Sequence, residues 1–184
     1  MTRTLTRLGA LALGLVFAVS ATPRAVRAAA QPYLIGAVLS ESGPGSSLGR
    51  PEADSVQLAV DEINKAGGVN GHPLTVQILD DESNPTTAVN DVRQLLDKHP
   101  IAVIGSSLTQ TTLAMEPLVQ AASIPLISLA SNAQVIEPVA QHKWTFKMPI
   151  TDTHVAATIQ SFLKKKNASK LAFIYRDDDY GKTG

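Results

Sequence analysis

Stretches typical of buried strands alternate with stretches typical of amphipathic helices from residue 33 to residue 175 of this 184-residue chain. A strand covered on both faces shows a continuous apolar run, whereas a covering helix shows apolar residues three and four positions apart. The segments that indicate strands are 33–39, 74–79, 101–104, 125–129, 144–148 and 170–175. Because parallel strands need a crossover between them, this alternation predicts an α/β fold with a parallel sheet and helices on both faces.

Four amphipathic stretches predict the helices. Their apolar residues are Val56, Ala59, Val60 and Ile63; Ala88, Val92, Leu95 and Leu96; those of 109–122; and Val155, Ile159, Phe162 and Leu163. Asn84 is a suitable N-cap for the second helix, with Pro85 at its first position. Pro117 lacks a backbone donor, so we expect the third helix to be interrupted or re-started there. Residues 40–49 are expected to form a loop.

The N-terminus has the pattern of an export signal. Arg3 and Arg7 precede an apolar run over 8–21, and Ala28 to Ala30 supply the small residues that signal peptidase requires. We expect cleavage after Ala30, with the bond after Ala21 as an alternative. A membrane anchor is disfavoured because the run is shorter than the roughly 20 residues that span a bilayer. Cleavage after Ala30 removes four arginines and no acid, so a mildly acidic periplasmic protein is expected.

Composition excludes several classes of protein. The chain has no cysteine, which excludes disulfides, thiolate metal sites and cysteine nucleophiles. Basic and acidic residues number 16 each, so a nucleic-acid partner is not expected. The four histidines lie far apart, at His72, His99, His142 and His154, and no nucleophile-elbow motif is present. We therefore expect no enzyme activity, no metal and no cofactor.

Seven segments, in order, resemble one family. They are LSESGP at 39–44, NKAGGVNGHPL at 64–74, DDESNP at 80–85, IGSS at 104–107, PLIS at 125–128, FKMP at 146–149 and YG at 180–181. Together they resemble the periplasmic branched-chain amino acid binding proteins, the solute-binding subunits of ATP-powered (ABC) importers. The resemblance implies a ligand held between two α/β lobes and a membrane permease as partner. The ligand would be an amino acid or a similar small carboxylate.

The same resemblance implies a division of the chain. Residues 1–30 are the signal peptide, 31–148 form a first ligand-binding lobe that is incomplete, and 149–184 are the truncated start of a second lobe. Pro149 interrupts the chain at the boundary.

The loop from Gly105 to Thr109 follows a strand and precedes a helix, where free backbone donors favour an anion. From the residues alone, a ligand site and simple capping by Ser107 or Thr109 are equally acceptable. The resemblance implies that a serine of this loop holds the ligand carboxylate, with Ser106 as the match and Ser107 as the alternative.

Further ligand-binding residues are implied by the resemblance. Ala130 and Ser131 would receive the ligand ammonium and carboxylate through a backbone carbonyl and a hydroxyl. Leu48 occupies a position where the family can have an aromatic residue over the ligand. Tyr180 corresponds to a second-lobe tyrosine that closes over the ligand.

Two alternatives come from the residues themselves. The loop from Gly43 to Gly49 has the spacing G-x-G-x-x-x-G, so a doubly wound nucleotide-binding enzyme is the alternative function, although the dinucleotide fingerprint is G-x-G-x-x-G. The acids at 80–82 could hold magnesium. We favour the interpretation that they are solvated charges at the start of the next helix.

Overall fold

The computed structural model describes residues 30–183, and its centre is a five-stranded parallel sheet. The strands are β1 (Tyr33–Leu39), β2 (Leu74–Asp80), β3 (Ala102–Gly105), β4 (Leu126–Ser128) and β5 (Thr145–Lys147). Their order across the sheet is β2-β1-β3-β4-β5, and every neighbouring pair is parallel. The predicted α/β class is therefore confirmed. The expected export signal lies, except for Ala30, outside the described residues.

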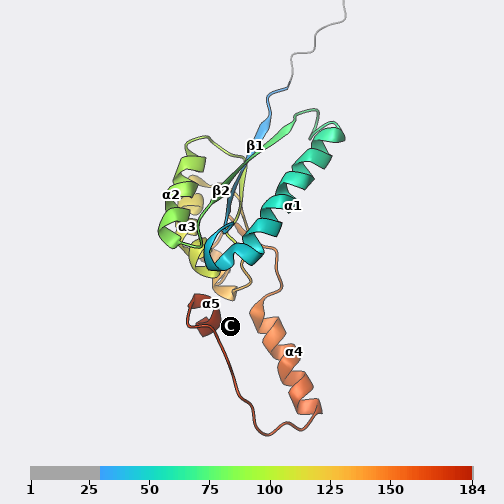
Figure 1. Cartoon of the computed structure of the whole chain (residues 1–184), viewed down its shortest axis with the longest axis vertical. Helices are drawn as coiled ribbons and strands as arrows, with labels where there is room; N and C mark the ends of the chain where they lie inside the picture. The colour runs from blue at the N-terminus through green and yellow to red at the C-terminus, as the bar shows by residue number, and fades with distance from the viewer. Residues whose placement is uncertain (1–29, 184) are drawn as a thin grey trace, which may run out of the picture.

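Helices cover both faces of the sheet. Helix α1 (Ser46–Lys65) lies on one face, and α2 (Pro85–Leu96) and α3 (Thr109–Ala122) lie together on the other (Figure 1). Short 3-10 turns occur at η1 (Gly43–Gly45), η2 (Ala133–Val135) and η3 (Val139–Gln141). Helices α4 (Asp152–Lys165) and α5 (Asp179–Thr183) follow the last strand.

Alternate side chains of β1 enter two cores. Val38 packs in the larger cluster, with residues of α2, α3, β3 and β4. Ala37 and Leu39 point to the opposite face and pack with Ala53 of α1. This period of two is what a strand buried on both faces produces. The α2–α3 side holds the main core, which comprises Val38, Ala88, Val92, Leu95, Val103, Met115, Val119 and Leu126.

Local signals account for the second helix but not for the bounds of the first. Asn84 caps α2 as predicted, because its side chain accepts hydrogen bonds from the backbone of Thr86 at 2.8 Å and of Thr87 at 3.3 Å. The expected loop over 40–49 is correct only as far as Gly45, since α1 already begins at Ser46. Gly49 makes this early start possible, because a Cβ there would collide with the carbonyl of Ser40.

The predicted interruption at Pro117 does not occur, and α3 continues through it from Thr109 to Ala122. Met115 and Val119 flank Pro117, and both are fully buried in the main core. We attribute the continuity to this packing, which offsets the missing backbone hydrogen bond of one proline.

The predicted strand over 170–175 is also wrong. Residues 168–176 belong to no helix or strand, and no strand of the described chain lies beside them. Phe173 is 82% exposed and Ile174 is fully exposed.

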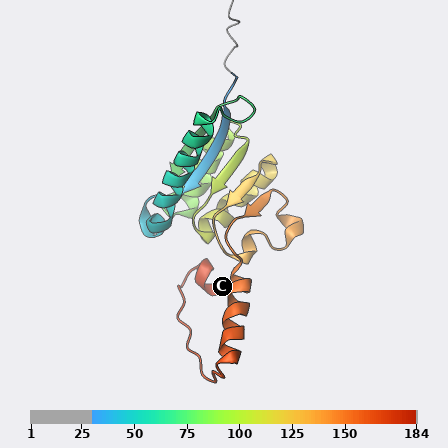
Figure 2. The ribbon, with the colours of Figure 1, turned by 90° about the vertical axis from the view of Figure 1, so that its right-hand side faces the viewer.

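Helix α4 projects away from the sheet, and the loop after it returns to α5 near the sheet (Figures 1 and 2). Of the apolar residues of α4, predicted to form a covered stripe, Val155, Ile159 and Phe162 are exposed and none is buried. Within residues 30–183, no helix is long and apolar enough to span a membrane.

Candidate functional site

A cavity of about 300 Å³ lies at the carboxyl ends of the strands. Its lining comes from four segments: the start of α1, the loop between β3 and α3, the loop after β4, and the segment leading into α5. These residues are Leu48, Glu52, Ser107, Leu108, Thr109, Gln110, Leu129, Ala130, Ser131, Arg176, Asp178 and Tyr180. Ligands of open parallel sheets bind at this edge, so this cavity is the candidate site.

The structure brings together five of the six residues that the sequence singled out. Leu48, Ser107, Ala130, Ser131 and Tyr180 all line this cavity. Ser106 does not line it, because its side chain is fully buried and turned towards the acidic end of β2. Its hydroxyl contacts Asp81 and Thr111, whereas the hydroxyl of Ser107 contacts Glu52 of the cavity lining, so only Ser107 faces the cavity.

Asp81 is the acceptor that holds Ser106. This carboxylate is fully buried and accepts hydrogen bonds from the hydroxyl of Ser106, from Ser40 Oγ at 2.6 Å and from the backbone of Ser83 at 2.8 Å. For Asp81, the interpretation as a solvated helix-start charge is therefore wrong. The carboxylate joins the loops that follow β1, β2 and β3. Among residues 30–183, no three His, Cys, Asp or Glu side chains lie close enough together to hold a metal ion.

Ser107 forms a second network on the cavity side of the same loop. Its hydroxyl donates to Glu52 Oε2 and accepts from the backbone of Ser40 at 3.1 Å. Burial raises the pKa of Glu52, the hydrogen bond from Ser107 lowers it in part, and the charge of Asp81 raises it further. Glu52 is one helical turn after Leu48, so both side chains lie on the cavity face of α1.

Helix α3 begins at the cavity without a side-chain cap. Its N-cap is Leu108, whose side chain has no acceptor, so neither Ser107 nor Thr109 fills the capping position considered from the sequence. The first backbone N–H groups of a helix lack intrahelical partners and carry the positive end of the helix dipole. Thr109 and Gln110 belong to this first turn and line the cavity, so an anion can be held here.

The loop after β4 forms the third part of the wall. The backbone N–H of Ala130 donates to Ser128 Oγ at 3.2 Å, and the carbonyl of Ser131 accepts from Lys147 Nζ at 2.9 Å. Burial lowers the pKa of Lys147, an effect that Asp152 and Glu137 oppose. Asn132 is buried behind this loop, where it caps η2 and donates to the carbonyl of Asp179 at 3.4 Å. Asn132 therefore links the loop to α5.

The opposite wall comes from residues 176–180. Arg176 Nη2 lies 2.6 Å from Asp178 Oδ2, and the other oxygen of Asp178 accepts from the backbone of Gly181 at 3.0 Å. Tyr180 belongs to α5, which contacts α3. Sequence reasoning missed Glu52, Arg176 and Asp178. The spacing of Glu52 from Leu48 is a usable signal, but only once the start of α1 is known.

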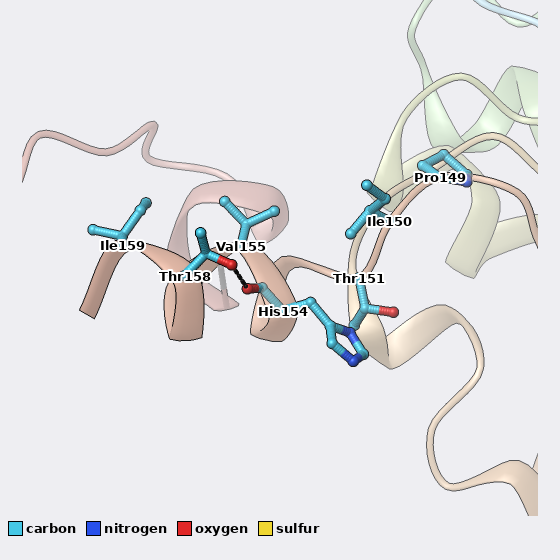
Figure 3. A pocket seen from close by; sticks show the side chains of 7 residues that line it. All are labelled: Pro149, Ile150, Thr151, His154, Val155, Thr158 and Ile159. Atoms are coloured by element: carbon cyan, nitrogen blue, oxygen red, sulfur yellow. Dashed lines mark hydrogen bonds between the residues drawn. The ribbon is translucent and has the colours of Figure 1, made fainter. Parts of the chain in front are cut away.

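A larger hollow of about 660 Å³ lies along α4 (Figure 3). Its lining is mostly apolar and consists of Pro149, Ile150, Thr151, His154, Val155, Thr158 and Ile159. The hydroxyl of Thr158 is engaged with the carbonyl of His154 at 2.9 Å. A ligand site needs several convergent polar groups, and this hollow does not provide them.

The alternative nucleotide loop does not form. Gly43 to Gly45 make a 3-10 turn and Gly49 lies inside α1. Two backbone donors near the first glycines are engaged, since Ser42 donates to Asp80 Oδ1 at 3.1 Å and Gly45 to Ser83 Oγ at 2.9 Å. These donors therefore do not form a phosphate cradle.

Comparison with known proteins agrees with this geometry. Residues 32–184 match the family described as periplasmic binding protein. The chain belongs to that family. Its members and structural neighbours are substrate-binding proteins, so the predicted absence of enzyme activity agrees with the family, and the nucleotide-enzyme alternative is not supported.

This periplasmic binding protein is similar to several named proteins. It is 29% identical over 163 residues to the chemotactic signal transduction system substrate-binding protein BasB of Halobacterium salinarum, covering 83% of this chain and 39% of BasB. An extracellular ligand-binding receptor from Rhodopseudomonas palustris HaA2 superimposes with a TM-score of 0.75 at 33% identity, covering 83% of this chain and 41% of that one. A third relative is the branched-chain amino acid transporter substrate-binding protein LivJ of Streptococcus pneumoniae, solved with isoleucine. It superimposes with a TM-score of 0.76 at 29% identity, covering 83% of this chain and 44% of LivJ. The chain thus spans less than half the length of these relatives.

Proposed function

We propose that this chain is part of an exported solute-binding protein that captures an amino acid or a similar small carboxylate. The supporting observation is the cavity at the carboxyl ends of the strands, where the uncapped start of α3 meets Ser131 and Tyr180. Membership of the periplasmic binding protein family and the isoleucine complex of the LivJ relative support the same class of ligand.

Within this proposal, residues 31–148 form the first lobe and residues 149–184 begin the second. Tyr180 and Arg176 then belong to the wall that moves towards the first lobe when ligand is bound. A ligand that contacts both walls favours the closed arrangement, because it gains contacts there that the open form lacks. The closed form is the state that the membrane permease of an ATP-powered importer would recognise.

Each wall has a proposed task. The first turn of α3 and the hydroxyl of Ser131 hold the ligand carboxylate, and the carbonyl of Ala130 accepts from its ammonium group. Leu48 and Tyr180 pack against the remainder of the ligand. Ser107 contributes to the wall, whereas Ser106 acts only through Asp81.

The test is calorimetric titration of the longest form of the chain that the gene encodes with a panel of free amino acids. We expect at least one to bind, and we expect Ser131→Ala to weaken binding by about 1.5–3 kcal/mol, the value of a hydrogen bond to a charged group. The amine that lacks the carboxylate of the same ligand should bind to Ser131→Ala and to wild type with equal affinity.

Ser55→Ala is the matched control, because Ser55 is exposed on α1, its hydroxyl donates to the carbonyl of Pro51, and it lies outside the cavity lining. If no amino acid or small carboxylate binds, or if Ser131→Ala and Ser55→Ala bind equally well, the proposed site is wrong.

A further inference from the structure

The polar groups of the cavity divide into a donor side and an acceptor side. The donor side is the start of α3, where Thr109 and Gln110 belong to an uncapped first turn. The acceptor side is formed by Glu52 and by the hydroxyl oxygen of Ser107. A ligand that fills the cavity must match both sides.

Ser107 cannot serve as a donor while its contact with Glu52 persists. A hydroxyl has one proton, and the proton of Ser107 is directed to Glu52 Oε2. The backbone of Ser40 already donates to the same hydroxyl oxygen. What Ser107 can still offer a ligand is a lone pair, which accepts and does not donate.

Glu52 has no cationic partner among the described residues. None of the ion pairs within residues 30–183 includes it. Arg176, the basic residue of the cavity lining, is paired with Asp178 at 2.6 Å. The charges of Arg176 and Asp178 offset each other, so the carboxylate of Glu52 leaves this side of the cavity electronegative. A second carboxylate placed against it would be repelled.

We propose that Glu52 is a specificity-determining residue that receives the cationic amino group of the ligand. The proposal rests on the proposed function. That function allows two ligand classes, amino acids and small carboxylates without an amine, and the proposal distinguishes between them. The site takes zwitterionic amino acids, with the carboxylate at the start of α3 and the ammonium at Glu52. It discriminates against the same acids without an amine. An ammonium group has three donors, so the carbonyl of Ala130 and Glu52 can both accept from it.

The experiment compares amino acids with their deaminated analogues by calorimetry, on the longest encoded form of the chain. The pairs are leucine with isocaproate, phenylalanine with phenylpropionate, glutamate with glutarate, and serine with hydroxypropionate. Glu52→Gln is the test variant, because the amide oxygen can still accept from Ser107 while the charge is lost. Glu62→Gln is the matched control, since Glu62 is exposed on the same helix and lies outside the cavity lining.

We expect wild type to prefer the amino acid of the bound pair by roughly ten- to hundredfold, the value of a hydrogen bond between charged groups. Glu52→Gln should reduce the ratio of the two affinities to near one, mainly by weakening the binding of the amino acid. Glu62→Gln should leave that ratio unchanged. The inference is overturned if wild type binds the deaminated acid as tightly as its amino acid. It is also overturned if Glu52→Gln weakens both members equally, which is the result of a merely structural role. Binding of no compound by wild type would instead contradict the proposed function.

Discussion

Replacing Asp81 tests whether one buried carboxylate holds the sheet edge on which the candidate site is built. Asp81 Oδ1 accepts from both Ser40 Oγ and the backbone of Ser83, and Oδ2 accepts from Ser106. Asp81→Ala removes both acceptor oxygens and all three hydrogen bonds. Each hydrogen bond to a charged group is worth about 1.5–3 kcal/mol, and a donor left buried without a partner is costly. The three losses do not add fully, because Ser106 keeps Thr111 as a second partner at 2.6 Å.

We therefore expect Asp81→Ala to lower the free energy of unfolding by about 3–5 kcal/mol. Asp81→Asn should cost only about 1 kcal/mol. Its amide oxygen can keep the two bonds at the Oδ1 position, and its amide nitrogen can donate to Ser106, whose hydroxyl is able to accept. The difference between the two variants, rather than either value alone, identifies the hydrogen bonds as the cause.

Urea unfolding followed by circular dichroism at constant pH measures both variants. Asp54→Ala and Asp54→Asn are the controls, because Asp54 is exposed on α1. If Asp81→Ala costs no more than Asp81→Asn, or no more than the Asp54 variants, the sheet edge does not depend on Asp81.

Three further predictions concern stability and export. Burial and then the charges of Asp81, Asp80 and Glu82 raise the pKa of Asp91 to about 6, and its Oδ2 is shielded without a hydrogen-bond partner. The folded state thus retains a proton that the unfolded state releases, so the free energy of unfolding falls as pH rises from about 4 to 6. In urea titrations, Asp91→Asn should therefore add about 1–2 kcal/mol to the free energy of unfolding at pH 7, allowing for solvent screening, but little at pH 4. Asn84→Ala should lower the free energy of unfolding by about 1 kcal/mol through loss of the α2 cap, whereas Asn90→Ala, exposed within the same helix, should not. Expressed in a Gram-negative host, the chain should lose its first 30 residues and occur in the periplasm, as mass spectrometry of that fraction would reveal; an intact chain in the membrane fraction would contradict this.

Elements with strong local signals could be predicted from the sequence. The bounds of β1 and α3 agree with the expected ones, and Asn84 caps α2 as its position before Pro85 indicates. The start of α1 could not be predicted, because the serines, glycines and prolines before residue 52 are typical of a loop. Gly49 is there for a tertiary reason, the close approach to Ser40, which no local pattern reveals.

The edge of the sheet that carries the candidate site was predictable, but the roles of its residues were only partly so. The carboxyl ends of β1, β3 and β4 meet at one edge in any parallel sheet, so the loops after them had to converge. Whether Ser106 or Ser107 faces the cavity depends on the course of the loop. Glu52 could be placed only from the orientation of α1, which follows from where that helix begins.

The two networks at this edge share Ser40, and this sharing indicates how the first wall is kept ready for a ligand. The hydroxyl of Ser40 donates to Asp81 on the buried side, while its backbone donates to Ser107 on the cavity side. A group held by partners on both sides loses little further freedom when a ligand arrives, so less binding energy is spent on ordering it. The opposite wall differs, because residues 168–175 are exposed and belong to no helix or strand before the chain returns to the cavity at Arg176. Motion between the walls is therefore expected to be concentrated in the segment before α5, with the loop from Gly105 to Thr109 as the fixed side.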